Sequence, residues 1–138
     1  VVADKFGKHR KLTKMRAYQL AGFAALGMNE YKEARDYLSR AYKFGKSNLK
    51  EDDGDLGALS VALGQAHAKM GNLKAARDSY AKGAKILQLA CDHAANPAQR
   101  ASNLRRLKKA LEYQISAAET AGAAAEAEAL KKRLAALP

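Results

Sequence analysis

The side chains best suited to nucleophilic or metal chemistry in this 138-residue sequence are one cysteine and three histidines. Cys91 and His93 are two residues apart in a segment that we expect to be helical, so their side chains point to different sides and cannot act as a nucleophile and its base. His9, His67 and His93 do not have the spacing of metal ligands. We expect Cys91 to be a small buried residue, and His67 to pack between two helices in preference to a role in a site.

The acidic residues and the glycines offer no recognisable site either. The run from Glu51 to Asp55 lacks the alternating oxygen ligands and the closing glutamate of a calcium loop. No glycine-rich phosphate loop occurs. We therefore predict no catalytic residue, no metal and no cofactor, and we predict that the protein is not an enzyme.

Positive charge is the main chemical feature, because 25 lysines and arginines against 14 acids give a formal net charge of +11. Two segments carry most of it: residues 1–16 have six cations and one acid, and residues 99–109 have five cations and no acid. The candidate cations of these two basic patches are Lys8, Arg10, Lys11, Lys14, Arg100, Arg105, Arg106 and Lys109. They could bind an acidic protein or nucleic-acid phosphates, or they could be solvated on exposed helix faces.

The surroundings of the two patches differ. In the second patch Leu104, Leu107 and Leu111 form a stripe typical of a buried helix face, which leaves Arg105, Arg106 and Lys109 on the outer surface. No aromatic residue lies between positions 99 and 109, so base stacking has no support there. The first patch has Phe6, His9 and Tyr18 nearby. A membrane surface is a weak candidate partner for this first patch, because its apolar face is poor for insertion.

The elements that position these residues are predicted to be helices. The sequence has 31 Ala and 17 Leu but only seven Val, Ile and Thr together, which favours an all-α chain of one domain. Apolar residues recur at helical spacing in six segments, which we group into hairpins at about 12–46, 55–94 and 98–137 after a basic arm at 1–11. We expect a loop from Gly45 to Gly54, Asn29 as the cap of the second helix and Pro97 at the start of the fifth.

The turns inside the predicted hairpins repeat one pattern. A glycine or asparagine is followed five residues later by alanine, as Asn29 with Ala34, Gly71 with Ala76 and Gly122 with Ala127. The first two turns are 42 residues apart and the last two 51. Small residues that tolerate left-handed backbone let two antiparallel helices reverse in few residues. Such a recurrence is typical of stacked helical hairpins.

The segment from Ala62 to Tyr80 resembles the tetratricopeptide repeat (TPR) family. It carries the Leu63-Gly64 pair of the family, the turn glycine, the second-helix alanine and the aromatic Tyr80. The segment from Ala21 to Ala41 is similar, with Asn29 in place of the turn glycine. The third unit departs from the pattern, because Lys131 stands where an aromatic is expected. The 42-residue spacing exceeds the usual period of about 34 and is similar to that of kinesin-light-chain-type adaptors.

The resemblance implies a right-handed stack whose concave face, built from the first helix of each hairpin, binds a peptide or helix of another protein. Aligned on the turns, the concave positions are Arg16, Gln19, Phe23, Val61, Gln65, Lys69, Lys109 and Glu112. This mixture suits an acidic or amphipathic segment, so we expect an adaptor or assembly scaffold. The alternative is a helical repeat that binds nucleic acid through the two basic patches.

Two further properties follow from the pattern of apolar residues. The longest apolar runs are a few residues, far below the roughly 20 of a membrane span, so we expect a soluble protein and favour the cytoplasm. The aromatic residues Tyr31, Tyr37, Tyr42 and Phe44 lie on or near one predicted helix. Tyr37 and Phe44 fall away from the centre of its packing face, where they either mark an interface or are partly buried.

Overall fold

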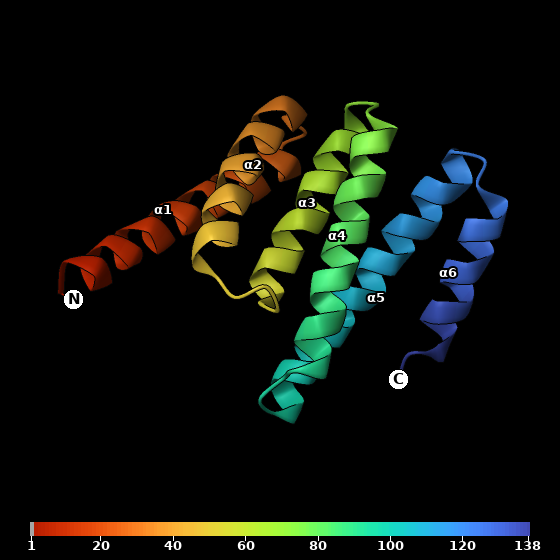
Figure 1. The fold of residues 1–138 in the computed structure, drawn as a ribbon. Coiled ribbons are helices and arrows are strands. Elements are labelled where there is room, and N and C mark those ends of the chain that lie inside the picture. The colour runs from red at the N-terminus through yellow and green to blue at the C-terminus, as the bar shows by residue number, and fades with distance from the viewer. Residues whose placement is uncertain (1) are drawn as a thin grey trace.

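The computed structural model describes the backbone from Val2 to Pro138 and the side chains from His9 onward. This part of the chain forms six α-helices and no strand (Figure 1). They are α1 (Val2–Gly27), α2 (Tyr31–Asn48), α3 (Gly54–Lys69), α4 (Leu73–Asp92), α5 (Pro97–Thr120) and α6 (Ala124–Ala136). The predicted all-α architecture of six helices is confirmed.

The helices form three antiparallel hairpins that stack side by side, with α1 and α6 at opposite ends (Figure 1). Each hairpin packs on the next through its second helix, so that α2 lies against α3 and α4 against α5. Among the first helices, α3 meets α1 and α5 only at a few positions. Residues 2–11, expected as an arm, are helical and continue directly into α1, because Gly7 does not interrupt the helix.

The three hairpin turns share one backbone geometry. Asn29, Gly71 and Gly122 adopt left-handed φ angles of 61°, 80° and 74°. In each turn the next N–H donates to the carbonyl five residues earlier over 2.8–2.9 Å, which closes the end of the first helix. The alanine five residues after each turn residue, Ala34, Ala76 or Ala127, is buried between the two helices. The repeat found in the sequence is therefore a structural repeat.

Asn29 has a different role from the one predicted. It ends α1 as the left-handed residue, and the N-cap of α2 is Glu30, which makes no side-chain capping bond. The Asn29 side chain instead accepts a 2.9 Å hydrogen bond from the hydroxyl of Tyr31. The prediction was wrong by one residue, because the left-handed position and the cap are adjacent and Asn favours both.

The predicted loop from Gly45 to Gly54 was too long. Helix α2 continues to Asn48, and only Leu49 to Asp53 connect it to α3. Gly45 is buried inside α2, where an added Cβ would lie 3.1 Å from Leu56 Cδ1 and 3.3 Å from Met15 Sδ. This glycine permits close packing of three helices and does not break α2.

Close approach of the paired helices also depends on glycine. Gly22 of α1 lies against Leu38 of α2, and Gly64 of α3 lies against the ring of Tyr80 on α4. An added Cβ at either glycine would come within 2.6 Å of that side chain. In α5 the corresponding residue is Ile115, so the third hairpin is built without this glycine contact.

The buried side chains form two clusters that follow the stack. The first contains Met15, Leu38 and Leu59 and joins α1, α2 and α3. The second contains Leu87 and Leu111 and joins α3, α4 and α5, with leucines of α6 packed against it. The helices are thus held mainly by contacts between sequence neighbours, as expected of a hairpin stack.

Candidate functional site

The predicted concave residues lie on the first helices of the hairpins, as the repeat requires. On α1, Arg16 is exposed, Gln19 is half-buried and Phe23 is 39% exposed. On α3 and α5, Gln65 is half-buried, while Lys69, Lys109 and Glu112 are exposed. Of these seven side chains, the two glutamines are half-buried and the other five are exposed, so that a partner could contact them.

Val61 is the one predicted partner-binding residue that the structure removes from the surface. It is 8% exposed and belongs to the cluster around Leu87 and Tyr80. Its Cγ2 atom occupies the space that a side chain at Gly83 of α4 would need, 2.5 Å from that ideal Cβ. The alignment on the turns assigned Val61 to the wrong face of α3, because its side chain packs against α4.

An ordered cluster joins the second and third hairpins where α3 meets α5. The Gln65 amide donates a hydrogen bond to the hydroxyl of Tyr113. The Tyr113 ring stacks on the ring of Tyr80, with 5.4 Å between centroids and an interplanar angle of 12°. Lys109 Nζ lies 5.7 Å from the centroid of the Tyr113 ring and 3.7 Å from the carboxylate of Glu112. We call Gln65, Tyr80, Lys109, Glu112 and Tyr113 the Tyr113 cluster.

The geometry of the Tyr113 cluster fixes a half-buried aromatic ring beside an exposed ammonium group. Burial, together with the neighbouring Tyr113, raises the pKa of the Tyr80 phenol to about 12. Tyr113 was absent from the predicted site, although it is the one aromatic residue of α5. Tyr113 directly follows the predicted residue Glu112 in the sequence. Helical spacing alone could not decide whether its ring belongs to the site or to the packing between helices.

The N-terminal basic patch combines with aromatic residues of α2. The side chain of Lys8 lies outside the described residues, and Arg10, Lys11 and Lys14 are exposed. Lys11 borders a groove of about 450 Å³ between α1 and α2. Its other lining residues are Tyr18, Arg40, Lys43, Phe44, Ser47 and Asn48.

Tyr18 is the centre of this basic aromatic groove. Its ring stacks on Phe44, with 5.9 Å between centroids and 10° between planes, and the Arg40 guanidinium carbon lies 5.6 Å from the Tyr18 centroid. Tyr37 is exposed and lies 6.3 Å from the same ring. Phe44 is half-buried, whereas the Tyr37 side chain is exposed to solvent. The two residues therefore have different roles.

The second basic patch is partly engaged within the protein. Arg106 forms a 3.2 Å ion pair with Asp55 of α3, which corrects its predicted place on a free outer surface. The Arg100 guanidinium donates to the carbonyl of Cys91 over 3.4 Å. Arg105 is exposed and forms no ion pair with an acid of the described chain. Arg100 and Arg106 thus join the second and third hairpins, whereas Arg105 and Lys109 remain exposed.

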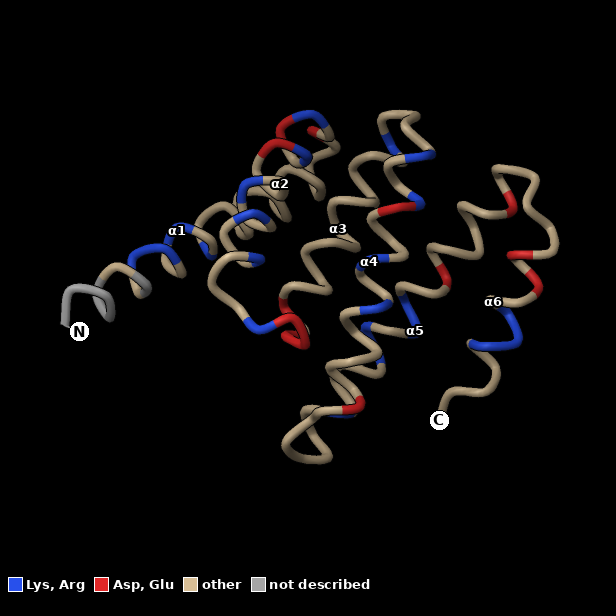
Figure 2. The backbone as a smooth tube through the Cα atoms, in the orientation of Figure 1, with Lys and Arg blue, Asp and Glu red and all other residues tan. Residues whose placement is uncertain are grey.

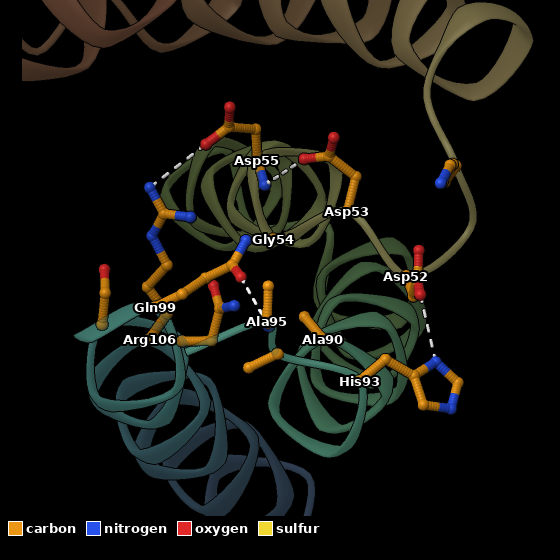
Figure 3. A pocket seen from close by; sticks show the side chains of 13 residues that line it. Asp52, Asp53, Gly54, Asp55, Ala90, His93, Ala95, Gln99 and Arg106 are labelled. Carbon is orange, nitrogen blue, oxygen red and sulfur yellow. Dashed lines mark hydrogen bonds and ion pairs between the residues drawn. The ribbon is translucent and has the colours of Figure 1, made fainter. Parts of the chain in front are cut away.

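A polar pocket of about 500 Å³ lies where the α2–α3 loop meets the α4–α5 turn (Figure 3). Asp52 forms a 3.0 Å contact with His93 Nδ1, and the Asp53 side chain accepts a 2.9 Å hydrogen bond from the amide of Asp55. Gly54 brings the backbone so close to Asn103 that a Cβ would lie 2.2 Å from its side-chain oxygen. The acidic run, red in Figure 2, therefore caps α3 and ties it to the third hairpin.

The potentially reactive side chains are in unreactive surroundings. Cys91 is buried, and burial, assisted by the Asp92 charge, raises the pKa of its thiol despite the opposing effect of Arg100. Half-buried His67 has its pKa lowered by burial and by the charge of Arg35. Within the described part of the chain, no group of three or more His, Cys, Asp or Glu side chains is placed to hold a metal ion.

No protein-family model matches the chain, and no curated protein matches it significantly. Along the described residues, no helix combines the length and the apolar character that a membrane span requires. The fold and the site geometry therefore define the class of protein here, an all-α stack of three helical hairpins with one basic aromatic groove and one half-buried tyrosine beside an exposed lysine.

Proposed function

We propose that this protein is a TPR-like adaptor or assembly scaffold, which binds an acidic or amphipathic segment of another protein on the face formed by α1, α3 and α5. The Tyr113 cluster is the observation that carries the proposal. It holds a partly exposed ring and the exposed ammonium of Lys109 at a junction between two hairpins. A preordered aromatic ring and a cation give a partner both contact area and charge recognition at low entropic cost.

The rest of this face has matching chemistry. Arg16 and Lys69 are exposed, and neither forms an ion pair with an acid of the described chain. Phe23 supplies a large apolar side chain that remains 39% exposed. Acidic residues of a partner would be steered by the cations, and an apolar residue could bury Phe23.

A peptide-binding experiment tests this proposal. Peptides are selected from a displayed random library on the wild-type protein, and their affinity is compared with that for the double variant Phe23→Ala plus Lys109→Glu. We expect selected peptides to combine acidic and apolar residues and to bind the double variant at least about tenfold more weakly. Lys85→Glu makes the same charge change on an exposed position of α4 and should leave the affinity unchanged. Equal binding to all three proteins would reject the site.

Nucleic-acid binding is the second candidate function, and the basic aromatic groove supports it. The stacked rings of Tyr18 and Phe44 are surrounded by Lys11, Arg40 and Lys43. Proteins that bind single-stranded nucleic acid combine cations and aromatic rings in this way. Binding of random single-stranded and duplex DNA is measured across a salt series. Affinity that persists at physiological salt and weakens in Arg40→Ala supports this function. Micromolar or weaker binding that vanishes by physiological salt excludes it.

A further inference from the structure

Helix α1 exposes an apolar stripe on the side that faces away from the stack. We call Ala17, Leu20, Ala21 and Ala24 the α1 stripe. Leu20 is 71% exposed, Ala17 and Ala24 are exposed, and Ala21 is half-buried. These residues share a helix face because they are spaced by three or four positions. A leucine this open at the middle of a helix contributes little to the fold of the described chain.

The internal repeat shows what covers this position elsewhere. A shift of 42 residues, which superimposes Asn29 on Gly71, places the α1 stripe on Leu59, Ala62, Leu63 and Ala66 of α3. Those α3 residues belong to a core cluster that contains Leu38 and Ala41 of α2. The second helix of the first hairpin therefore packs on the α3 equivalent of the α1 stripe.

The third hairpin obeys the same rule. A further shift of 51 residues places Leu59 and Ala66 on Ala110 and Ala117 of α5, which are buried. Here α4 packs on α5 in the same way as α2 packs on α3. At both interior junctions a helix covers this face, so the geometry of the α1 stripe suits a helix as its occupant.

Charge defines the chemistry of that helix. From His9 to Gly27, α1 carries Arg10, Lys11, Lys14 and Arg16 and no acid (Figure 2). Two copies that met through this face would bring the same cations together, which opposes a symmetric dimer. An apolar helix flanked by acids would instead bury Leu20 and neutralise the cations.

We propose that the α1 stripe binds an amphipathic helix of another protein whose apolar face covers Leu20 and whose flanks are acidic. This surface is separate from the Tyr113 cluster, which lies on α3, α4 and α5. A nucleic acid fits it less well, because Leu20 and the three alanines offer neither an aromatic ring nor a hydrogen-bond donor.

The probe is a synthetic stapled helix that keeps the buried face of α2, Ala34, Leu38 and Ala41, and has glutamate at its flanking positions. A matched peptide has lysine at those positions. We expect the glutamate peptide to bind the wild-type protein, and Leu20→Lys to weaken this binding at least about tenfold. Ala24→Arg is a second variant on the same stripe. Met70→Lys, at an exposed apolar position in α3's C-terminal turn, should have no effect.

Three further measurements decide the proposal. A photoreactive residue at Ala24 should cross-link the glutamate peptide, and one at the exposed Ser39 on α2 should not. Lys109→Glu, on α5, should leave this binding intact, which separates it from the proposed function above. Binding that is insensitive to Leu20→Lys and Ala24→Arg, or equal for the two peptides, overturns the proposal. So does Leu20-dependent self-association in sedimentation, because the occupant would then be a second copy.

Discussion

Replacement of Gly64 by alanine tests whether glycine sets the distance between the helices of the second hairpin. The added Cβ would lie 2.6 Å from Cδ1 and Cε1 of the Tyr80 ring and 3.2 Å from the Ala76 carbonyl oxygen. The ring cannot swing away freely, since it is buried and stacks on Tyr113. Separation of α3 from α4 would be needed to relieve both contacts.

The two opposing effects can be compared in magnitude. Alanine is favoured over glycine inside a helix by about 1 kcal/mol. Overpacking of a filled core costs about 1–3 kcal/mol, and contact with both a fixed ring and a backbone oxygen places Gly64→Ala toward the upper end. We therefore expect a net loss of about 1–2 kcal/mol in the free energy of unfolding, or a fall of about 3–8 °C in Tm for a chain of this length.

Urea and thermal unfolding, followed by far-ultraviolet circular dichroism, measure this loss. Gly27→Ala is the matched control, because no atom lies within 4 Å of its added Cβ and its φ is not left-handed. We expect the control to be as stable as the wild-type protein or slightly more stable. If Gly64→Ala is as stable as Gly27→Ala with an unchanged urea dependence, the close contact with Tyr80 does not determine the helix spacing.

Three other perturbations have expected outcomes. Asn29→Gly should raise the free energy of unfolding by about 0.5–1 kcal/mol in urea, because glycine adopts the observed φ of 61° without strain; a loss would contradict this. The unfolded chain releases the Tyr80 proton near pH 10 and the folded chain near pH 12, so unfolding free energy should fall as pH rises through that window, and less so in Tyr80→Phe. Cys91 in the folded chain should react slowly with a disulfide reagent at neutral pH and rapidly in urea, because its thiol is buried and its pKa is raised. Rapid reaction without urea would refute this.

Local backbone requirements made the hairpin turns predictable from the sequence. Asn29, Gly71 and Gly122 belong to the few residue types that tolerate left-handed φ, and an apolar helical pattern precedes and follows each of them. The predicted helix break at Gly45 was wrong, because a glycine that ends a helix and a glycine that allows close approach of a neighbouring helix look the same in the sequence. Only the positions of Leu56 and Met15 in the fold distinguish them.

The alignment on the turns, which the family resemblance supplied, placed Gln65 and Lys109 on the first helices of their hairpins, and both belong to the Tyr113 cluster. That they bind a partner stays a prediction. The same alignment put Val61 on the wrong face, because it could not decide which neighbour covers that side chain, and Val61 packs on α4. The pairing of Asp55 with Arg106 joins residues 51 positions apart and depends on how the hairpins stack.

The two ends of the stack differ chemically, and this difference bears on how the protein could associate. At the α6 end, Leu130 and Leu134 face inward against the core, and the helix carries Glu126 and Glu128 as well as cations (Figure 2). At the α1 end, Leu20 is exposed on a helix that carries four cations and no acid from His9 to Gly27. Head-to-tail contact between copies would set Leu20 against alanines and mixed charges, with little gain from burial or charge. An acidic amphipathic helix therefore finds a more complementary surface at α1 than at α6.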